Sequence, residues 1–599
     1  MTGASVDWDQ DGAPRSRLFD DVYFSRAGGL EEARAVFLAG CGLPSAWKGR
    51  QRFVVGELGF GTGLNVLALL DLWRRERPPG ARLNIFSVEA HPLAAEDAAR
   101  ALAAWPQMAD LAQPLLDRWP TARGFHRLDF PNLNAVLDLA VLEAAEALQA
   151  WDGPADAWFL DGFSPAKNPQ MWRDEVLGLV AARSAPGARA ATYTVAGAVR
   201  RGLEAQGFSV SKRPGFGGKA ERLEAVLADG LPRPGESTRR IAIVGAGIAG
   251  ASIARALRAE GIRPVVVDAG PPGGGASGNP AALVTPRFDA GGGPVAALFA
   301  QAFARAVALY AQEAPGSVIA RGALQLEAQA RDARRFDRIA RSDLFEPGAL
   351  TRLSPEDAGE RLGEPVQAGG LWIRDALVVE PAAILAAWLE GCDVVRTEVS
   401  RLEPGGGAWR LMGADGQIIL EADAVIVAAG FGAARLLPDL PLQPVRGQAS
   451  IAGEPHGPVP AAWGGYVIPT RDGVLFGATH DRDETSCETR AQDHVRNLAL
   501  LAQRRPALAA ALSETPLAGR AALRAATPDR LPLAGPAPGA PNGLCVLGGL
   551  GGRGFALAPL LGEHLAAAVL GAPGPLPRPL AAAVDPRRFQ PPFSEGQAH

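Results

Sequence analysis

Apolar and polar positions follow the same order at two places in the chain, and the first place lies near residue 60. Residues 53–58 form a mostly apolar run, a glycine-rich turn occupies 59–63, and residues 64–72 carry apolar side chains at helical spacing. A short apolar run that is bounded by glycine indicates a buried strand. The pattern therefore predicts a strand, a tight turn and a helix, in this order.

The same order returns after residue 240. An apolar run at 241–244 leads into a glycine-rich turn at 245–250, a helix is expected over 251–260, and a second apolar run follows at 264–268. Apolar strands that alternate with amphipathic helices are typical of α/β domains with parallel sheets. The two patterns therefore predict two α/β domains.

Proline and other turn-forming residues between the two patterns mark a domain boundary. A single hydrophobic core rarely grows beyond about 250–300 residues, so a chain of 599 residues is expected to hold at least two domains. We predict a first domain at 1–230, a linker at 231–239, a second domain at 240–575 and a proline-rich tail at 576–599.

The composition narrows the class of protein. No continuous apolar stretch reaches the roughly 20 residues that cross a bilayer, and the polar start of the chain has no apolar signal-peptide core. We therefore expect no membrane partner and a cytoplasmic location. The net charge of −4 is not typical of a nucleic-acid-binding protein, but a local basic patch is enough to bind nucleic acid.

The cysteines are far apart and form no CxxC pair, so we expect neither a disulfide framework nor a metal site. They are Cys41, Cys392, Cys487 and Cys545.

The second glycine-rich turn has the spacing of a dinucleotide-binding motif. Gly245 allows the tight turn, Gly247 admits a pyrophosphate close to the backbone, and Gly250 lets helix and strand pack closely. The helix N-terminus offers free N–H groups to phosphates, and Asp268 can accept hydrogen bonds from ribose hydroxyls. The alternative is a chance turn in a glycine-rich chain. The expected cofactor contacts are Gly245, Ala246, Gly247, Ile248, Gly250 and Asp268.

Three further segments favour FAD over NAD. Residues 275–279, 424–430 and 548–554 resemble a phosphate-contacting turn, a strand near the dinucleotide and a flavin-facing turn of the D-amino-acid-oxidase and glycine-oxidase family. In that family the last turn opens a helix whose N-terminus stabilises negative charge on the reduced flavin. The contacts that this resemblance implies are Ala276, Ser277, Asn279, Ala429, Gly430, Gly549, Gly551, Gly552 and Gly554.

Two arginines close to these segments are candidates for binding a substrate carboxylate. Arg553 lies inside the last turn, and Arg524 precedes the segment 527–532. A guanidinium group is always charged and can bind a carboxylate through two parallel hydrogen bonds. The alternative is a structural role, because arginine is abundant in this chain.

The first glycine-rich turn resembles motif I of class I methyltransferases, in which glycines let the backbone approach the methionine part of S-adenosylmethionine. Its form, with an acid before three alternating glycines, differs from the dinucleotide motif and disfavours a second NAD-type site. Glu89 ends the next apolar run and would bind the ribose hydroxyls, and Asp129 matches the third acidic position, near the adenine. The implied contacts are Glu57, Gly59, Gly61, Gly63, Glu89 and Asp129.

Residues 156–169 are the most distinctive stretch of the chain. An apolar run ends at Asp161, and a loop bounded by proline follows. This stretch resembles motif IV of methyltransferases that act on amines, where the acceptor nitrogen is held beside the sulfonium. We expect Asp161 to orient the amine and to stabilise the positive charge that develops on it.

Both halves together resemble the bacterial family of bifunctional tRNA 5-methylaminomethyl-2-thiouridine biosynthesis enzymes, over nearly the whole chain. The resemblance implies a class I methyltransferase domain, followed by an FAD-binding Rossmann domain with an inserted α+β substrate domain. It also implies two reactions at the wobble uridine in the anticodon loop of tRNA. The FAD domain removes the carboxymethyl group of 5-carboxymethylaminomethyluridine, and the other domain methylates the resulting 5-aminomethyluridine. Pro528 departs from the pattern, because the family has arginine before this aspartate.

A cluster of basic residues near the end of the first domain is the candidate tRNA contact, with a solvated surface as the alternative. It consists of Arg200, Arg201, Lys212, Arg213, Lys219 and Arg222. We expect a monomer. Two rival functions remain at this point: a fused oxidase and methyltransferase for a free amino acid or peptide amine, and a non-enzymatic FAD-binding scaffold.

Overall fold

The computed structural model describes residues 4–9, 12–24, 28–217, 220–230, 240–454 and 457–590. The chain divides into two compact units. Unit 1 comprises Met1–Glu236 and Leu570–Arg578, and unit 2 comprises Ser237–Val569 and Pro579–His599. The expected linker 231–239 lies outside the described residues, and the sequence-based boundaries stay predictions. The return of a short C-terminal segment to unit 1 was not expected from the sequence.

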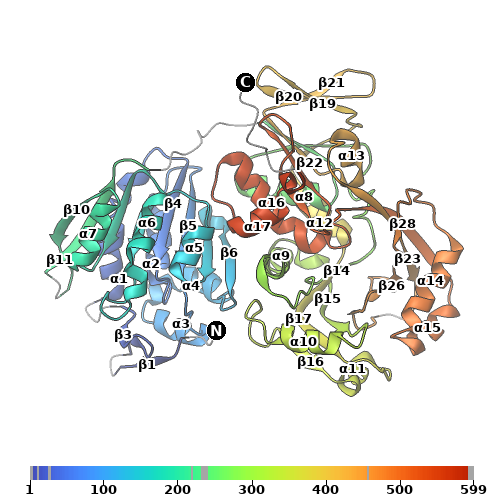
Figure 1. The fold of residues 1–599 in the computed structure, drawn as a ribbon, viewed down its shortest axis with the longest axis horizontal. Helices are drawn as coiled ribbons and strands as arrows, with labels where there is room; N and C mark the ends of the chain where they lie inside the picture. The colour runs from blue at the N-terminus through green and yellow to red at the C-terminus, as the bar shows by residue number, and fades with distance from the viewer. Residues whose placement is uncertain are drawn as a thin grey trace. The chain divides into compact units, whose positions relative to one another are not determined.

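Unit 1 is built around an eight-stranded sheet with the order β10-β11-β9-β8-β4-β5-β7-β6 (Figure 1). Its five central strands are parallel, and the pairs β6–β7, β9–β11 and β10–β11 are antiparallel. The strands are β4 (Arg52–Leu58), β5 (Arg82–Val88), β6 (Gly124–Phe130), β7 (Ala135–Val141), β8 (Ala155–Leu160), β9 (Ser184–Thr192), β10 (Phe208–Pro214) and β11 (Glu221–Leu227).

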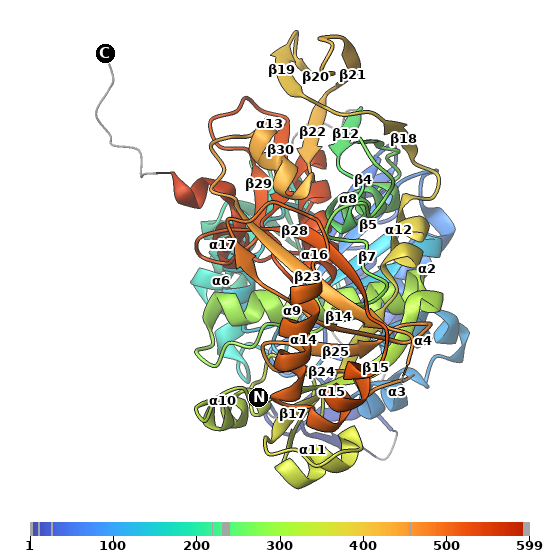
Figure 2. The ribbon, with the colours of Figure 1, turned by 90° about the vertical axis from the view of Figure 1, so that its right-hand side faces the viewer.

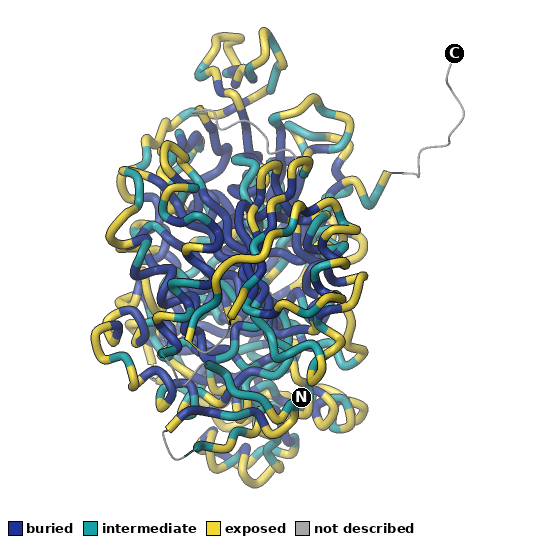
Figure 3. The backbone as a smooth tube through the Cα atoms, turned by 90° about the vertical axis from the view of Figure 1, so that its left-hand side faces the viewer, coloured by how far each residue is buried: buried dark blue, intermediate teal, exposed yellow. Residues whose placement is uncertain are grey.

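Helices cover both faces of this sheet, so its central strands are buried almost continuously. In β4, Phe53 and Val55 join one apolar cluster, while Val54 and Leu58 join the cluster on the opposite face. The tube in Figure 3 shows buried backbone in the interior and exposed segments around it. The helices include α2 (Leu64–Glu76), α3 (Ala95–Leu102), α4 (Ala109–Leu116), α5 (Ala144–Ala150), α6 (Asp174–Ala182) and α7 (Gly197–Ala205).

A small three-stranded sheet precedes this core. It consists of β1 (Val6–Trp8), β2 (Pro14–Ser16) and β3 (Asp21–Val22). The strand and helix that we predicted over 53–72 are confirmed as β4 and α2, and α2 continues to Glu76.

Unit 2 contains a six-stranded sheet with the order β18-β13-β12-β22-β30-β29. Its strands are parallel except that β29 runs against β30. They are β12 (Ile241–Val244), β13 (Val265–Asp268), β18 (Asp393–Arg396), β22 (Ala424–Val427), β29 (Leu533–Pro536) and β30 (Leu544–Gly548). Helix α8 (Ile248–Ala259) follows β12 and begins three residues before the expected start, because Gly250 lies inside its first turn.

A ten-stranded, largely antiparallel sheet forms the second layer of unit 2. Figure 2 shows its long strands β23 (Gln443–Ala452) and β28 (Ala518–Ala526), which pair along their whole length. The other strands are β14 (Ala282–Val284), β15 (Val318–Leu326), β16 (Leu350–Leu353), β17 (Gly370–Val379), β24 (Ala461–Ala462), β25 (Tyr466–Pro469), β26 (Val474–Gly477) and β27 (Asp481–Arg482). The α/β fold class, with a Rossmann-type sheet and an inserted α+β layer, is confirmed.

Further helices complete unit 2, and a separate hairpin sheet of β19 (Arg401–Gly405), β20 (Ala408–Met412) and β21 (Ile418–Ala422) stands beside them. The helices are α9 (Gly293–Glu313), α10 (Asp332–Ala340), α11 (Pro355–Leu362), α12 (Pro381–Leu389), α13 (Ala433–Leu436), α14 (Ala491–Ala502), α15 (Pro506–Ser513), α16 (Gly554–Leu570) and α17 (Arg578–Val584).

Helix α9 corrects one expectation from the sequence. By length and hydropathy it could cross a membrane, and it is the one such helix among the described residues. Its apolar window is 56% buried inside the protein. Arg305, near its middle, forms a buried ion pair with Glu563 of α16 at 2.5 Å.

Candidate active sites

A cavity of about 680 Å³ opens at the carboxyl ends of the parallel strands of unit 1. Loops that follow four neighbouring strands line it, with Gly59 and Gly61 after β4, Glu89 after β5, Glu143 after β7 and Asp161 after β8. Ligands of open α/β sheets bind at this edge, because the loops there converge and helix N-termini point toward it. The structure therefore brings most of the predicted residues of unit 1 together.

The first glycine-rich turn requires glycine for steric reasons. Gly59, Gly61 and Gly63 have φ angles of 88°, 54° and 78°, which side-chain-bearing residues rarely adopt. A Cβ atom on Gly59 would lie 1.8 Å from the carbonyl oxygen of Asp161. The turn thus passes directly against the start of the loop after β8, and Gly63 caps α2 without lining the cavity.

The Glu89 carboxylate is held by backbone donors. The N–H of Gly61 donates to its Oε2 at 2.9 Å, and the N–H of His91 donates to its Oε1 at 2.8 Å. Burial raises the pKa of Glu89, and these two hydrogen bonds oppose that rise. The arrangement fixes an acceptor at the cavity wall, as a ribose diol requires.

Glu57 lies beneath the turn and does not line the cavity. It is completely buried, and Ser87 Oγ donates to its Oε2 at 2.5 Å. Its Oε1 has no hydrogen-bond partner among the described residues. Burial, opposed by Ser87 and reinforced by the nearby Asp161, raises the pKa of Glu57 to about 8. Glu57 is therefore mostly protonated near pH 7.

The raised pKa of Glu57 makes a prediction about stability. Above its ordinary value of 4.5 the unfolded chain releases this proton, while the folded protein keeps it up to about pH 8. The free energy of unfolding should then fall as pH rises through this window, by up to about 1.4 kcal/mol per pH unit. Urea unfolding at pH 5.5 and 7.5, followed by tryptophan fluorescence, should show this fall. In Glu57→Gln most of this fall in the free energy of unfolding should disappear. If the free energy falls equally with pH in both proteins, Glu57 is not its cause.

Asp161 follows β8 and is positioned by α2. Asn65 Nδ2 donates to its Oδ2 at 2.7 Å, and the Tyr193 hydroxyl donates to the carbonyl oxygen of the neighbouring Gly162 at 2.5 Å. Burial raises the pKa of Tyr193, and the charge of Asp161 adds to the effect. Asn65 and Tyr193 both line the cavity, but no local motif in the sequence indicated them.

The expectation that Asp129 lies near the cofactor is wrong. Strand β6 runs antiparallel to β7, and Phe130 pairs with Ala135, so Asp129 lies at the amino end of β7. The cavity opens at the other end of that strand, where Glu143 takes the expected place. The acid was misplaced because the sequence did not reveal the antiparallel edge strand.

The second cavity, of about 1040 Å³, lies in unit 2 and is lined by residues of the turns at 245–250, 275–279 and 548–554. Ala246 N–H donates to Asp268 Oδ2 at 2.6 Å, and Ile248 N–H donates to Ser277 Oγ at 3.0 Å. The first bond joins the turn at 245–250 to Asp268, and the second joins the same turn to the turn at 275–279. The predicted residues in the lining are Gly245, Gly247, Ile248, Asp268, Ala276, Ser277, Asn279, Ala429, Gly430, Gly549, Gly551, Gly552 and Gly554.

Two residues of this motif that we predicted as cofactor contacts, Ala246 and Gly250, do not line the cavity. Ala246 uses its backbone N–H on Asp268, and a Cβ atom on Gly250 would lie 1.8 Å from the carbonyl oxygen of Gly245. Gly250 therefore allows α8 to pack on its own turn. Arg520 of β28 was not predicted, yet its guanidinium donates to Asn279 Oδ1 at 3.2 Å and to the Gly275 carbonyl at 2.5 Å.

Asp268 carries a prediction about flavin retention. Its Oδ1 also accepts from Gly270 N–H at 2.8 Å, so its carboxylate both orders two turns and faces the cavity. Asp268→Ala should weaken FAD binding by about 2 kcal/mol, the usual cost of losing hydrogen bonds to a charged group. Titration of the apoprotein with FAD measures this change. Asp423→Ala, which removes an acid that directly precedes β22 and does not line the cavity, serves as the matched control.

Two arginines contribute positive charge to the lining of this cavity. Arg553 and Arg524 both line it, together with Tyr466 and His480. Arg553 Nη1 donates to the backbone carbonyls of Thr285 and Pro286, each at 3.2 Å. Burial lowers the pKa of Arg553 to about 10, and the charges of two nearby arginines contribute. It remains protonated near pH 7.

Arg524 has a different environment. It lies on β28 opposite Val445, and among the described residues its guanidinium has no hydrogen-bond or ion-pair partner. Burial lowers the pKa of His480, and the positive charge of Arg524 lowers it further. The His480 imidazole is therefore neutral near pH 7 and adds no positive charge beside Arg524.

Pro528 lies in a turn beyond the end of β28, and the chain reaches Arg530 two residues later. The Thr527 hydroxyl lies 2.9 Å from Asp529 Oδ1 and 2.6 Å from the Leu531 carbonyl oxygen, so it can donate to either and hold the turn closed. Arg588 pairs with Asp529 at 2.8 Å and anchors the turn.

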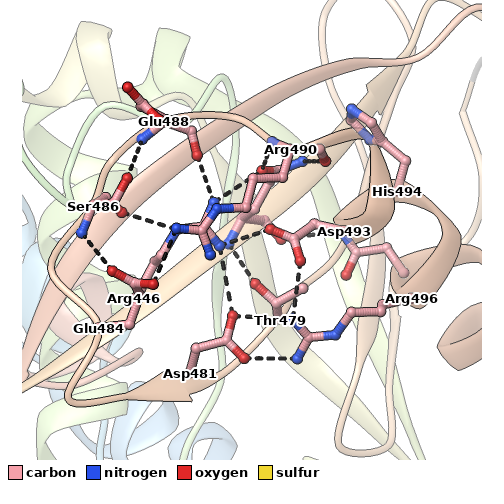
Figure 4. A network of polar contacts seen from close by, with 12 residues as sticks. Arg446, Thr479, Asp481, Glu484, Ser486, Glu488, Arg490, Asp493, His494 and Arg496 are labelled. Atoms are coloured by element: carbon pink, nitrogen blue, oxygen red, sulfur yellow. Dashed lines mark hydrogen bonds and ion pairs between the residues drawn. The ribbon is translucent and has the colours of Figure 1, made fainter.

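A buried polar network supports the wall that carries His480 (Figure 4). Arg446 of β23 is fully buried and pairs with Asp493 at 2.7 Å. Its guanidinium also donates to the backbone carbonyls of Ser486 at 2.9 Å and Glu488 at 2.5 Å. These contacts join the loop after β27 to strand β23 and to helix α14.

The predicted basic cluster is largely paired with acids. Lys212 pairs with Glu221 at 2.7 Å, Arg222 with Glu224 at 2.6 Å, and Arg200 with Glu204 at 3.1 Å. Arg213 also lies 3.6 Å from Glu224. Arg201 forms no ion pair within the part of the chain that the structure describes, and Lys219 lies outside that part. The role of the basic cluster in tRNA binding stays a prediction. No group of three or more potential metal ligands occurs among the described residues.

Comparison with known proteins agrees with these two sites. A family model described as FAD dependent oxidoreductase matches residues 240–568, and one described as S-adenosyl-L-methionine-dependent methyltransferase matches 106–228. The two cofactors that we predicted, FAD and S-adenosylmethionine, are thereby confirmed. L-proline dehydrogenase from P. horikoshii shares the fold, with a TM-score of 0.50 and 18% identity, over 59% of this chain and 98% of that structure.

Two curated relatives match along the whole chain. The protein of Caulobacter sp. (strain K31) is 60% identical over 598 residues, and that of Caulobacter vibrioides (strain ATCC 19089 / CIP 103742 / CB 15) is 58% identical over 591 residues. Each alignment covers 98% of this chain and 98% of the relative. The chain therefore belongs to the family of the tRNA 5-methylaminomethyl-2-thiouridine biosynthesis bifunctional protein MnmC.

Proposed function

We propose that the chain carries out two consecutive modifications of the wobble uridine of tRNA. Unit 2 removes the carboxymethyl group from 5-carboxymethylaminomethyl-(2-thio)uridine, and unit 1 methylates the 5-aminomethyl product. The observation that carries the proposal is the position of Arg524, whose guanidinium lies unpaired, within the described residues, in the same cavity as the dinucleotide turns. A substrate with a carboxylate close to its reacting carbon fits that arrangement.

The residues of unit 2 fit FAD and a glycine-like substituent. Gly247 caps α8, and a Cβ atom at this position would crowd Ser277 Oγ at 3.1 Å, so glycine keeps the turn open to a pyrophosphate. Bound FAD would supply a two-electron oxidant for the substrate carbon beside the nitrogen, and water would hydrolyse the oxidised carbon–nitrogen bond to a primary amine and glyoxylate. Arg524 and Arg553 bind the carboxylate, and the neutral His480 imidazole leaves the substrate amine without a neighbouring cationic histidine.

The residues of unit 1 fit S-adenosylmethionine and an amine. The Glu89 carboxylate, fixed by two N–H donors, binds the ribose hydroxyls. S-adenosylmethionine supplies the methyl group when bound. Asp161, held by Asn65, orients the incoming amine and stabilises its developing positive charge. Because methyl transfer removes one positive charge and creates another, orientation supplies most of the rate.

The partner in this proposal is the anticodon loop of tRNA, and the protein acts in the cytoplasm as a monomer. No membrane or metal takes part. The basic residues at the end of unit 1 contribute phosphate contacts, which make affinity for tRNA depend on salt.

Nucleoside mass spectrometry tests the function directly. Purified protein is incubated with tRNA from a strain that lacks this activity, with and without S-adenosylmethionine. We expect 5-aminomethyluridine without the cofactor and 5-methylaminomethyluridine with it. If tRNA stays unchanged while a small amine reduces the bound flavin, the substrate is a free amine and the tRNA proposal fails.

A further inference from the structure

The mouth of the unit 1 cavity carries an aromatic cluster that the two reactions do not yet explain. Phe19 and Phe163 stack with ring centroids 4.9 Å apart, Tyr23 meets Phe163 edge-on at 5.2 Å, and His91 lies 5.7 Å from Phe19. All four residues line the cavity. The cluster joins the loop after β8 to the loop after β5, across the glycine-rich turn.

The cluster is not an ordinary packing core. Phe19 and Phe163 remain partly exposed, and the neighbouring Leu18 is 64% exposed while lining the same cavity. By contrast, Trp47 and Trp73 of unit 1 also meet edge-on, and both are fully buried. Apolar rings left open at the rim of a cavity mark a binding surface.

The segment that supplies Phe19 is fixed to the loop that supplies Phe163. Asp21 Oδ2 accepts from Ser164 N–H at 3.0 Å, and Lys167 Nζ donates to the Asp20 carbonyl. Lys167 Nζ also lies 3.8 Å from the carboxylates of Asp20 and Asp21. The position of the Phe19 ring is therefore determined before any substrate binds.

The chemistry of the acceptor decides what this surface contacts. In 5-aminomethyluridine a single methylene separates the amine from the uracil ring, so a ring whose amine lies at Asp161 must itself lie beside Asp161. Phe163 is two residues from Asp161 along the same loop. Glu89, which we propose binds the cofactor, and the cavity-lining Glu143 follow other strands, β5 and β7.

We propose that Phe19 and Phe163 form a stacking platform for the uracil ring of the tRNA nucleotide whose amine is methylated. The inference rests on the proposed function and names the surface that selects the acceptor. A base that is turned out of the anticodon loop stacks on aromatic side chains, which accept any base face and exclude water from the amine. Tyr23 and His91 hold the two rings in place.

Methyl transfer to tRNA that carries 5-aminomethyluridine tests the platform. Phe163→Leu and Phe19→Leu keep apolar side chains but lose the ring, and we expect each to raise KM for tRNA about tenfold, the ordinary effect of losing one base–aromatic stack. Phe163→Tyr keeps the ring and should retain a KM close to that of the wild type. The affinity for S-adenosylmethionine, measured by calorimetry, should stay unchanged in all three.

Trp8→Leu provides the matched control. Trp8 is a partly exposed ring in the same N-terminal sheet, where it packs on Arg100 at 4.0 Å, and it does not line the cavity. The platform is refuted if Phe163→Leu and Phe19→Leu have the same KM for tRNA as Trp8→Leu. It is also refuted if their affinity for S-adenosylmethionine falls as their KM for tRNA rises. If the wild type binds S-adenosylmethionine but methylates no tRNA, the proposed function itself fails.

Discussion

Arg524→Met should lower kcat/KM for oxidation of the carboxymethylamine about a thousandfold and leave methyl transfer unchanged. The substrate carboxylate would enter a cavity end where one of its two cationic partners is gone. Removing one partner of a buried, hydrogen-bonded charge pair costs about 2–5 kcal/mol, and about 4 kcal/mol corresponds to a thousandfold. Stopped-flow reduction of the flavin by modified tRNA, at several tRNA concentrations, measures the effect.

Two control variants separate charge from geometry. Arg524→Lys keeps the charge but loses the planar pair of donors, so its activity should lie between those of the wild type and Arg524→Met. Arg482→Met removes a charge from an exposed position outside the cavity lining and should have little effect. The pKa of His480 should rise in Arg524→Met, because one cause of its lowering is removed. Unchanged flavin reduction in Arg524→Met would assign the carboxylate to Arg553 alone.

The local pattern of the sequence was sufficient to predict the cofactor turns. In both units an apolar strand, glycines and a helix follow one another along the chain, and the geometry of such a turn depends on neighbours in sequence. Gly250 has a steric reason within its own segment, because it lets the helix approach the Gly245 carbonyl oxygen, whereas the close approach at Gly59 is to the distant Asp161. Asp268 and Glu89 were predicted in the same way, since Asp268 ends β13 and Glu89 directly follows β5.

The missed residues depend on contacts between distant segments. Asn65 reaches Asp161 across 96 positions, and Arg520 reaches Asn279 across 241 positions. No periodicity or spacing signals such a pair in a single sequence. The prediction for Asp129 was wrong for a related reason, because the position of Asp129 depended on which strand formed the edge of the sheet.

The division of the chain shows a second limit of sequence patterns. Leu570–Arg578 groups with unit 1 although it follows α16 of unit 2. Within unit 1, Arg578 pairs with Asp152 at 2.7 Å, and the Arg127 guanidinium approaches the Pro573 carbonyl at 3.5 Å. The proline-rich composition indicated a tail from residue 576, but it could not indicate that the segment at its start groups with unit 1.

Asp161→Ala should lower kcat for methyl transfer by two to three orders of magnitude and leave flavin reduction intact. The carboxylate is held by Asn65 close to the glycine-rich turn, so it is already oriented when the amine arrives. Removing one preorganised group that stabilises developing charge costs about 10²–10³ in kcat. Transfer of a radiolabelled methyl group to tRNA, at saturating concentrations of both substrates, measures it.

Glu89→Gln is the matched comparison, because it changes an acid of the same cavity that faces the cofactor and not the amine. It should weaken binding of S-adenosylmethionine and retain most of kcat at saturation, whereas Asp161→Ala should retain cofactor affinity and lose kcat. Asp161→Asn keeps an oxygen that can accept from Asn65 but carries no charge, so its kcat separates orientation from charge. A kcat close to that of the wild type in Asp161→Asn would assign the role to orientation alone, and a loss of cofactor affinity in Asp161→Ala would place Asp161 in the cofactor site.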